Sequence, residues 1–391
     1  MVRIAIAGGG IGGLTAALAL KEFGFESEIY EQAPALLDVG AAIALWPNAL
    51  RVLERLGLAD TIRKHAGEMN EIRWLDHRGS LLNRLSIPRS VALHRADLQA
   101  VLLHALPPRW IRLGHTLKSY DERKDKIVAG FTHGEEIEAD YLIGADGIHS
   151  QVRSQVLHDD QPTYRGYTVW RGISSVVPDG VPPATAVEIH GHGKRFGIGP
   201  VGNARIGWWA AANAANAAER TTQDNQRRHQ QEHHRHDSQN ELLRLFDGWC
   251  APVVQLIATT PPERILTTPA FDRDPQRTWG SGRVTLLGDA IHPTTPNLGQ
   301  GGCLAMEDAL VLARCFEEYG ATEEALRKYE NCRYRRTAAI VKYSRYYGRA
   351  GQSANIFIRG LKTSILSLAP ESVMRRLVRT VFAYDATTTP I

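Results

Sequence analysis

The chain has 391 residues, of which 43% are hydrophobic, so one or two domains with a sizeable core are expected. The 46 basic residues nearly balance the 42 acidic ones, and the net charge of +4 is too small to indicate a nucleic-acid-binding protein. The sequence has no run of about 18 uncharged apolar residues, which excludes a membrane-spanning helix, and the N-terminus lacks the long apolar stretch of a signal peptide.

The N-terminal segments predict a strand, a helix and a second strand. "VRIAIAGGG" is a buried strand that ends in glycines, "GLTAALALKEFG" is helical, and "ESEIYEQ" is the second strand. This order predicts a doubly wound parallel sheet. Gly8-x-Gly10-x-x-Gly13 lies between strand and helix, where Gly8 permits a tight turn and Gly10 lets a pyrophosphate approach the backbone. Glu31 ends the second strand and can accept hydrogen bonds from ribose hydroxyls, so a dinucleotide is the expected ligand.

The middle of the chain predicts a second sheet. From Tyr164 to about Phe271, strand-like segments such as "GYTVWRGIS" and "RFGIGPVGNARIGWWAA" follow one another, and the hairpin-like "EIRWLDHRGSLLNRLSI" is expected to join them. Gly197-x-Gly199-x-x-Gly202 repeats the dinucleotide spelling without a following helix, so it is predicted to be strand and turn.

Residues 211–240 form a polar, low-complexity insertion in this region. Four of its histidines could bind a metal, namely His229, His233, His234 and His236. We favour a solvated helix or a mobile loop for this insertion and expect no bound metal in the protein.

A strand, a proline-containing turn and a glycine-rich helix start follow in "RVTLLGDAIHPTTPNLGQGG". Asp289 lies at the strand tip, where a carboxylate can hold a sugar-like hydroxyl, and the glycines leave backbone N–H groups free before the helix "CLAMEDALVLARCF". Such a helix start favours negative charge, which a reduced flavin carries near N1. The stretch therefore favours the flavin end of FAD over NAD, although taken alone Asp289 is equally well explained as an ordinary N-cap.

"LIGADGIHSQVR" supplies a third motif, in which Asp146-Gly147 follows a strand and precedes Ser150 and Arg153. Together the three motifs resemble the single-component FAD-dependent monooxygenases, the class that contains aromatic-ring hydroxylases and zeaxanthin epoxidase, from residue 1 to about 350. The resemblance implies that Asp146-Gly147 touches the FAD pyrophosphate and assists NAD(P)H, that Asp289 binds the ribityl chain, and that the 296–302 loop caps the flavin. The cofactor-binding residues expected on this basis are Gly8, Gly10, Ile11, Gly12, Gly13, Glu31, Gln32, Ala42, Arg95, Asp146, Gly147, Asp289, Pro296, Gly299, Gln300, Gly301 and Gly302.

Within this family, "GYTVWRG", "GHGKRF" and "TTPNLGQGGCLAMEDA" most resemble bacterial FAD-dependent urate hydroxylases. In those enzymes an arginine and a tyrosine on the next strand hold the purine. Arg195 matches the arginine, but Gly207 stands at the tyrosine position, which suggests a larger or more apolar ring system than urate. Arg195 has an alternative role as the partner of Glu188 across the sheet, and each tryptophan has a core position as its alternative. The expected catalytic and substrate pocket comprises Trp46, Trp170, Arg195, Trp208 and Pro296.

The predicted fold class is α/β: a Rossmann-like FAD-binding domain with an interleaved mixed β-sheet substrate domain and C-terminal helices. The FAD-binding domain is expected to comprise residues 1–70, 95–163 and 272–350, and the substrate domain residues 71–94 and 164–271. Residues 351–391 predict two basic amphipathic helices separated by Pro370. They either pack over the pocket entrance or contact a membrane surface that supplies an apolar substrate.

The expected function is that of an NAD(P)H-dependent flavoprotein monooxygenase, in which O2 adds at flavin C4a and the hydroperoxide hydroxylates an aromatic, heteroaromatic, enol or alkene group. The alternatives are a flavin-dependent reductase or epoxidase acting on an apolar, isoprenoid-like substrate, and a flavin-holding protein that consumes no NAD(P)H. A monomer or homodimer is expected. The four cysteines, which show no paired spacing, are Cys250, Cys303, Cys315 and Cys332. We therefore expect reduced thiols and a cytoplasmic location.

Overall fold

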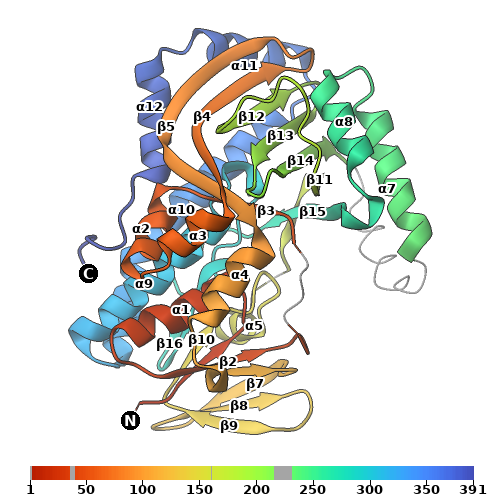
Figure 1. Cartoon of the computed structure of the whole chain (residues 1–391). Coiled ribbons are helices and arrows are strands. Elements are labelled where there is room, and N and C mark those ends of the chain that lie inside the picture. Colours follow the sequence, from red (N-terminus) through yellow and green to blue (C-terminus); the bar gives the residue numbers. More distant parts are fainter. Residues whose placement is uncertain (1, 36–39, 160, 215–230) are drawn as a thin grey trace.

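The computed structural model describes residues 2–35, 40–159, 161–214 and 231–391 (Figure 1). These residues form sheets of six, eight and three strands, with the six-stranded sheet in the lower half of Figure 1 and the eight-stranded sheet in the upper half. Most of the predicted polar insertion, including His229, lies outside the described residues, and the chain is described again from the start of a helix at residue 231.

The six-stranded sheet has the predicted parallel, doubly wound form. Its order is β16-β17-β10-β1-β2-β6, and every neighbouring pair is parallel except β16 with β17. All four residues of β1 are buried, as expected for a parallel strand covered on both faces. The strands are β1 (Ile4–Ala7), β2 (Ser27–Glu31), β6 (Ile111–Leu113), β10 (Tyr141–Gly144), β16 (Gly280–Ser281) and β17 (Val284–Leu286).

The eight-stranded sheet is mixed and has the order β15-β11-β14-β13-β12-β4-β5-β3. β12 and β4 are parallel, and the other neighbours are antiparallel. Residues 42–45, which the expected ranges placed in the FAD-binding part, form a strand of this sheet. The strands are β3 (Ala42–Leu45), β4 (Gly67–Asp76), β5 (Leu81–His94), β11 (Thr163–Ser174), β12 (Thr185–His190), β13 (Lys194–Pro200), β14 (Ile206–Asn213) and β15 (Leu266–Asp272).

A small antiparallel sheet at the lower end of Figure 1 contains β7 (Leu117–Glu122), β8 (Ile127–Phe131) and β9 (Glu136–Ala139). The chain also has short 3-10 turns, η1 (Pro108–Trp110), η2 (Pro262–Arg264), η3 (Gly288–Ala290) and η4 (Pro296–Leu298). The second dinucleotide spelling is strand and turn, as predicted, because Gly197 and Gly199 lie in β13 and Gly202 lies in the turn that follows.

The helices pack around and between the large sheets. Thr322 caps α10, with its Oγ1 accepting from the N–H of Ala325 at 3.2 Å. Pro370 separates α11 from α12, as the sequence predicted. The helices are α1 (Ile11–Glu22), α2 (Pro47–Arg55), α3 (Ala59–His65), α4 (Arg95–His104), α5 (Gln151–Leu157), α7 (Gln231–Leu245), α8 (Ala251–Thr259), α9 (Gly301–Tyr319), α10 (Glu323–Gly351), α11 (Ile356–Leu368) and α12 (Glu371–Phe382).

No helix within the described ranges is long and apolar enough to cross a bilayer. In the same part of the chain all four cysteine thiols are free.

Candidate active site

Two helices that pack against each other, α1 and α9, begin at the carboxyl edge of the parallel sheet. Gly10 is the N-cap of α1 and Gln300 is the N-cap of α9. Among the described residues no side chain caps either helix, and neither has an acidic residue in its first turn. The first N–H groups of a helix lack intrahelical partners and carry partial positive charge, so both starts favour an anionic ligand.

The glycines of the N-terminal loop divide into two kinds. Gly8 has φ +107°, and an added Cβ would lie 2.4 Å from the Ala145 carbonyl oxygen; at Gly13 it would lie 2.0 Å from the Gly8 oxygen. These two glycines, and Gly12 against Leu287, are therefore required for packing. At Gly10 an added Cβ would meet no atom of the described chain within 4 Å. Gly10 thus faces open space at the start of α1, where the sequence predicts the pyrophosphate.

Glu31 holds this loop in place from the end of β2. Its carboxylate accepts hydrogen bonds from the N–H groups of Gly9 at 2.6 Å and Ala33 at 2.9 Å. A carboxylate has about four lone-pair positions, so Glu31 keeps capacity for ribose hydroxyls. Gln32 beside it is exposed, whereas the Ile11 side chain is buried in the core and can reach a ligand only through its backbone.

The Asp146-Gly147 motif follows β10 and leads into α5. The Asp146 carboxylate accepts from the N–H of Gln151 at 2.7 Å, and its burial raises its pKa, against the opposing effect of hydrogen bonds from Ser150 and the backbone. Gly147 has φ +80°, and an added Cβ would meet nothing within 4 Å in the described structure. Gly147 is therefore the second position at this edge that faces open space.

Asp289 lies in η3, directly after β17, and the start of α9 is its neighbour: an added Cβ on Gly301 would lie 3.7 Å from Asp289 Oδ1. The side chain is exposed, yet burial is the main cause that raises its carboxyl pKa, with His292 and Arg95 acting in the opposite direction. Solvent thus reaches the carboxyl although protein atoms lie close to it on most sides, and we term this exposed recess the opening.

Two arginines lie near each other on this side of the molecule. Arg95, the first residue of α4, is exposed, and its charge acts on both Asp289 and Arg171. Burial, followed by the charge of Arg95, lowers the pKa of the Arg171 guanidinium. The sequence predicted Arg95 but missed Arg171. Successive side chains of β11 point to opposite faces of the sheet, so Arg171 lies on the face opposite to Trp170. This alternation is the sequence signal that could have revealed Arg171.

Arg153 joins the second and third motifs. It is buried, and its guanidinium donates to the carbonyl oxygens of Ala290 at 3.2 Å and Ile291 at 2.7 Å, and to Asp159 at 2.7 Å. A buried, fully charged donor between two loops fixes their separation. The two loops at the sheet edge therefore form one unit.

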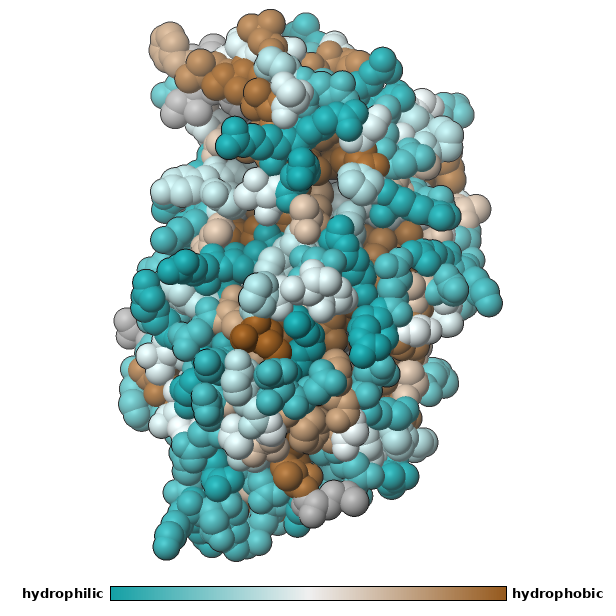
Figure 2. Space-filling model, turned by 90° about the vertical axis from the view of Figure 1, so that its left-hand side faces the viewer, coloured by the Kyte–Doolittle hydropathy of each residue, from teal (hydrophilic) through white to brown (hydrophobic). Residues whose placement is uncertain are grey.

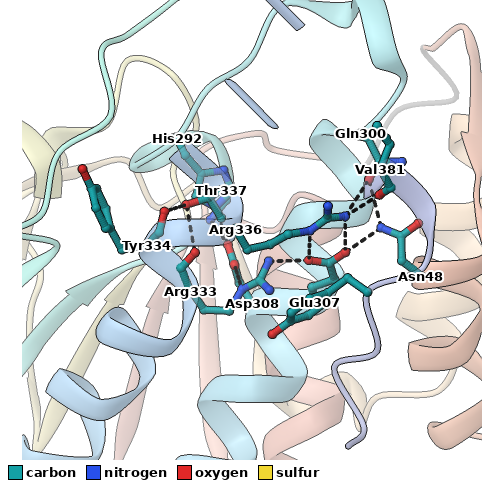
Figure 3. A network of polar contacts seen from close by, with 12 residues as sticks. Asn48, His292, Gln300, Glu307, Asp308, Arg333, Tyr334, Arg336, Thr337 and Val381 are labelled. Carbon is teal, nitrogen blue, oxygen red and sulfur yellow. Dashed lines mark hydrogen bonds and ion pairs between the residues drawn. The ribbon is translucent and has the colours of Figure 1, made fainter. Parts of the chain in front are cut away.

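A buried polar network supports residues 288–302 from behind (Figure 3). Asp308 on α9 accepts from the N–H of Gly288 at 3.1 Å and pairs with His292 at 2.5 Å and with Arg333 at 2.6 Å. Burial alone would raise the pKa of Asp308, but His292 and Arg333 together lower it. At the other end of the loop, Asn48 donates to Gln300 at 2.9 Å. The network thus holds residues 288–302 at both ends. No sequence pattern indicated it, because its members come from α2, α9, α10 and residues 288–300.

The eight-stranded sheet has two different faces. Trp170 and Trp208 pack with Phe196 in a core that includes residues of α7 and α8, and Trp208 Nε1 donates to Thr260 Oγ1 at 2.8 Å. These two tryptophans therefore occupy the core position that was the alternative for each. Strand alternation places Trp209 and Arg195 on the opposite side, which we term the inner face.

Arg195 on the inner face is fully buried. Its Nη1 donates to Glu188 at 3.1 Å and its Nη2 donates to Asn297 Oδ1 in the predicted flavin loop. The guanidinium also lies over the rings of Trp209 at 5.3 Å and Tyr347 at 5.5 Å. The alternative pairing with Glu188 is thus present, and Arg195 in addition connects the sheet to the cofactor loop.

Tyr167, Ser344 and Tyr347 complete this connection between the sheet and the loop. Sequence patterns did not reveal these three residues. Asn297 Nδ2 donates to the Tyr167 hydroxyl and to the Ser344 carbonyl oxygen, both at 2.9 Å, and the Tyr347 hydroxyl donates to Glu188 at 2.6 Å. Burial raises the pKa of Tyr347 well above its ordinary value, and the nearby Glu188 raises it further. Tyr347 therefore stays protonated at neutral pH and acts as a hydrogen-bond donor, not as a base.

Gly207 also lies on the inner face, opposite Gly199. An added Cβ on Gly207 would lie 2.6 Å from both Ala42 Cβ and Val201 Cγ1. Ala42 and Val201 therefore fill the space that a tyrosine would need, and a tyrosine introduced here would displace β3 instead of lining a purine site.

Trp46 contacts the predicted flavin loop at Gly299, which has φ +60°. An added Cβ on Gly299 would lie 3.0 Å from Trp46 Nε1. The indole stacks on Phe382 of α12, with centroids 4.2 Å apart. Gly302 packs against Ile43, and Pro296 at the start of η4 is exposed. The end of the chain thus reaches the rear of the cofactor loop.

A cavity of about 280 Å³ lies between the end of β12, the end of α10 and α11, and its lining includes His190, Gly351 and Thr363. An added Cβ on Gly351 would lie 2.6 Å from Arg195 Nε, so only one residue separates this cavity from Arg195.

Comparison with known proteins identifies the class. Residues 1–344 match the FAD binding domain family, and the chain belongs to it. It is 37% identical to the aurachin C monooxygenase/isomerase of Stigmatella aurantiaca over 94% of both chains, and 33% identical to an FAD-dependent urate hydroxylase of Klebsiella pneumoniae over 88% of this chain and 89% of that one. The crystal structure of Klebsiella pneumoniae HpxO with FAD and uric acid superposes with a TM-score of 0.88 at 30% identity, covering 97% and 96% of the two chains. The chain is an FAD-dependent monooxygenase, as the three motifs predicted.

Proposed function

We propose that this monooxygenase uses NAD(P)H and O2 to hydroxylate an electron-rich aromatic or heteroaromatic small molecule. The observation that carries the proposal is the sheet edge at which Asp289 and the starts of α1 and α9 lie, with the charge of Arg95 acting on Asp289. It has donors for an anionic dinucleotide and an acid for a hydroxyl-bearing chain, as FAD requires.

The residues present fit FAD in the following way. Gly10 and Gly147 leave room where the pyrophosphate would bind, Glu31 would accept from the adenosine ribose, and Asp289 would accept from the ribityl chain. The loop from Pro296 to Gly302 would help to hold the flavin. FAD, when bound, supplies the redox chemistry, taking electrons from NAD(P)H and activating O2.

The inner face is the proposed substrate side. Arg195 carries N–H donors that suit a ring carbonyl or enolate, Tyr347 holds its partner Glu188 in place, and Trp209 offers an aromatic surface. Because Arg195 also bonds Asn297, substrate binding and the position of the flavin loop are coupled. The contact of the loop with this face, through Asn297, would help to exclude water from the reacting groups.

The test is a substrate screen with purified protein. The protein should be yellow and release FAD, substrate should stimulate NAD(P)H oxidation, and oxygen from labelled O2 should appear in the product. Substrate-stimulated oxidation with no labelled oxygen in the product would favour the alternative of a flavin-dependent reductase.

The second candidate function, epoxidation or reduction of an apolar, isoprenoid-like substrate, is favoured by the C-terminal helices. Figure 2 shows apolar side chains at the top of the molecule, where α11 lies in Figure 1. The exposed apolar residues of α11 and α12 are Phe357, Leu361, Ile365, Leu368, Val373 and Leu377. We propose that this patch makes peripheral contact with a membrane from which such a substrate is taken.

Sedimentation with anionic phospholipid vesicles tests the membrane contact. The wild type should cosediment, and Leu361→Ser should reduce binding while FAD content stays unchanged. Equal behaviour of the two proteins would leave these helices with the packing role over the cavity, which α11 already lines through Thr363. We also propose a cytoplasmic location, which the expected reduced thiols favour. We further propose that the protein is a monomer or a homodimer.

A further inference from the structure

Three metal-ligand-type side chains meet at the small sheet. His115 lies between β6 and β7, and His133 and Glu135 lie in the turn between β8 and β9 (Figure 1). Glu135 Oε2 is 3.1 Å from His115 Nε2 and 3.0 Å from His133 Nε2. The three ligand atoms all lie within 4.8 Å of one another.

The protonation of His115 follows from its other nitrogen. Nδ1 lies 2.7 Å from the Leu113 carbonyl oxygen, which can only accept, so Nδ1 carries the hydrogen. In a neutral ring Nε2 then directs its lone pair at the Glu135 carboxylate. That contact is repulsive unless the ring is protonated or a cation lies between the two atoms.

The separations suit a transition metal. With bonds of about 2.0–2.1 Å, a tetrahedral Zn²⁺ ion places its ligand atoms roughly 3.3 Å apart, slightly more than the two distances to Glu135 Oε2. The Leu113 carbonyl orients His115 by accepting from its second nitrogen, as an outer partner of a metal-binding histidine does. The side chains of His133 and Glu135 are 42% and 49% exposed, so an ion can enter and a water can take the fourth position.

We propose that His115 Nε2, His133 Nε2 and Glu135 Oε2 form a binding site for a divalent transition metal of the Zn²⁺ type. Two imidazoles and one carboxylate are a donor set that Zn²⁺, Ni²⁺ and Cu²⁺ accept and that Mg²⁺ and Ca²⁺ disfavour. The site departs from the expectation of no metal, which considered only the histidines of the polar insertion.

A metal here would act as a structural clamp beside the carboxyl edge of the six-stranded sheet, which carries the predicted cofactor motifs and which we term the cofactor edge. The N–H of His115 donates to the Glu31 carbonyl oxygen at 2.8 Å, and its ring packs edge-on against Tyr30 and Phe131. Metal binding would tie the turn that carries His133 to the segment beside Glu31. The clamp should therefore raise the thermal stability of the protein, whatever substrate the enzyme uses.

The experiment has to separate this site from the insertion. The full chain without an affinity tag is treated with a chelator and dialysed against Zn²⁺, in a background in which His229, His233, His234 and His236 are replaced by Gln. This background should bind one Zn²⁺ per chain, and its Tm should rise when Zn²⁺ is added. Zn²⁺ bound by the wild type but not by the background would overturn the proposal.

Single changes in the same background assign the ligands. His133→Gln and Glu135→Gln should each weaken Zn²⁺ binding at least about 10-fold, the smaller of the losses seen even for outer partners of metal ligands. His104→Gln is the control, because His104 is an exposed histidine whose Nδ1 also lies near a backbone carbonyl, that of Ala100. FAD content and circular dichroism report folding for each variant. Unchanged Zn²⁺ affinity in both ligand variants would leave the cluster as a carboxylate paired with two imidazolium rings.

Discussion

The cofactor edge of the six-stranded sheet and the inner face of the eight-stranded sheet are built by different means. At the edge, the capacity to bind resides in the backbone: Gly10 and Gly147 face open space, and the starts of α1 and α9 present free N–H groups. On the inner face, the proposed substrate side, the polar groups are buried side chains, with Arg195 bonded to Glu188 and Asn297.

The difference has a physical consequence. A backbone site presents its N–H donors as soon as the loop adopts its fold. A side chain added in the open space in front of them therefore blocks the ligand but leaves the packing of the protein unchanged. A buried side-chain network is bonded in the free protein, so a change in it costs stability and function together. The following predictions separate the two behaviours, beginning with the largest effect.

Gly10→Val should abolish FAD binding and leave the fold intact. Gly10 has φ −72° and ψ −178°, an extended conformation that valine adopts readily, and its Cβ would meet open space. Gly13→Val is the contrasting variant, because its Cβ would overlap the Gly8 oxygen at 2.0 Å and should prevent folding. The measurements are FAD per chain and circular dichroism. A Gly10→Val protein that remains fully loaded would show that no pyrophosphate lies there.

Arg195→Lys should lower both the free energy of unfolding and substrate-stimulated turnover. Lysine keeps the charge but cannot bond Glu188 and Asn297 with the same planar fork. The loss of one charged hydrogen bond in a buried site costs about 1.5–3 kcal/mol, or roughly 10- to 150-fold in substrate affinity.

The matched control is Arg205→Lys, which alters the partly exposed pair with Asp97. A pair of this kind contributes about 0–1 kcal/mol, so urea unfolding should barely change. Equal unfolding free energies for the two variants would mean that the inner-face network contributes no more than a surface pair.

Asp289→Asn should weaken FAD binding by about 1–3 kcal/mol, because an accepting carboxylate in the opening is lost. The protein without FAD should be as stable as the wild type or more so at neutral pH. The carboxyl pKa is raised in the folded state, so its ionised form is a cost of folding that disappears as the pH falls through that pKa.

Urea unfolding of both apoproteins as a function of pH checks the sign of this effect. The advantage of Asp289→Asn should shrink on acidification. An advantage that grows toward acid pH would mean that the folded protein stabilises the ionised carboxyl, as it would an ordinary N-cap.

Gly207→Ala should destabilise the protein by about 1–3 kcal/mol through contact with Ala42 and Val201. Gly199 is its partner across β13 and β14, and a Cβ there would meet only Met69 Sδ at 3.7 Å, an ordinary contact. Gly199→Ala is therefore expected to be nearly neutral in urea unfolding. The prediction fails if the two alanine variants unfold at the same urea concentration.

The smallest effect is expected from replacing residues 215–230 by a short glycine-serine linker. Deletion should stop short of Asn213, which lies in β14, and of Gln239, which donates to the Thr260 carbonyl at 2.8 Å. Polar, low-complexity segments contribute little to a core, so FAD content and NAD(P)H oxidation should stay close to those of the wild type. A large loss of activity would assign a functional role to the insertion.

Much of the cofactor edge is determined by local sequence. Gly8, Gly13 and Glu31 are fixed by turn geometry and strand ends, and Thr322 and Pro370 mark helix starts, because each acts on backbone within a few residues. Periodicity likewise predicted the parallel sheet and the second, mixed sheet.

Only the tertiary structure decided which side chains meet. The choice between Trp208 and Trp209 depends on which face α8 covers, and the contact of Arg195 with Asn297 joins residues 102 positions apart. His115 and His133 become neighbours only through the pairing of short strands. A sequence fixes local backbone preferences directly, but the burial and charge environment of a side chain depend on distant segments, and these are set by packing.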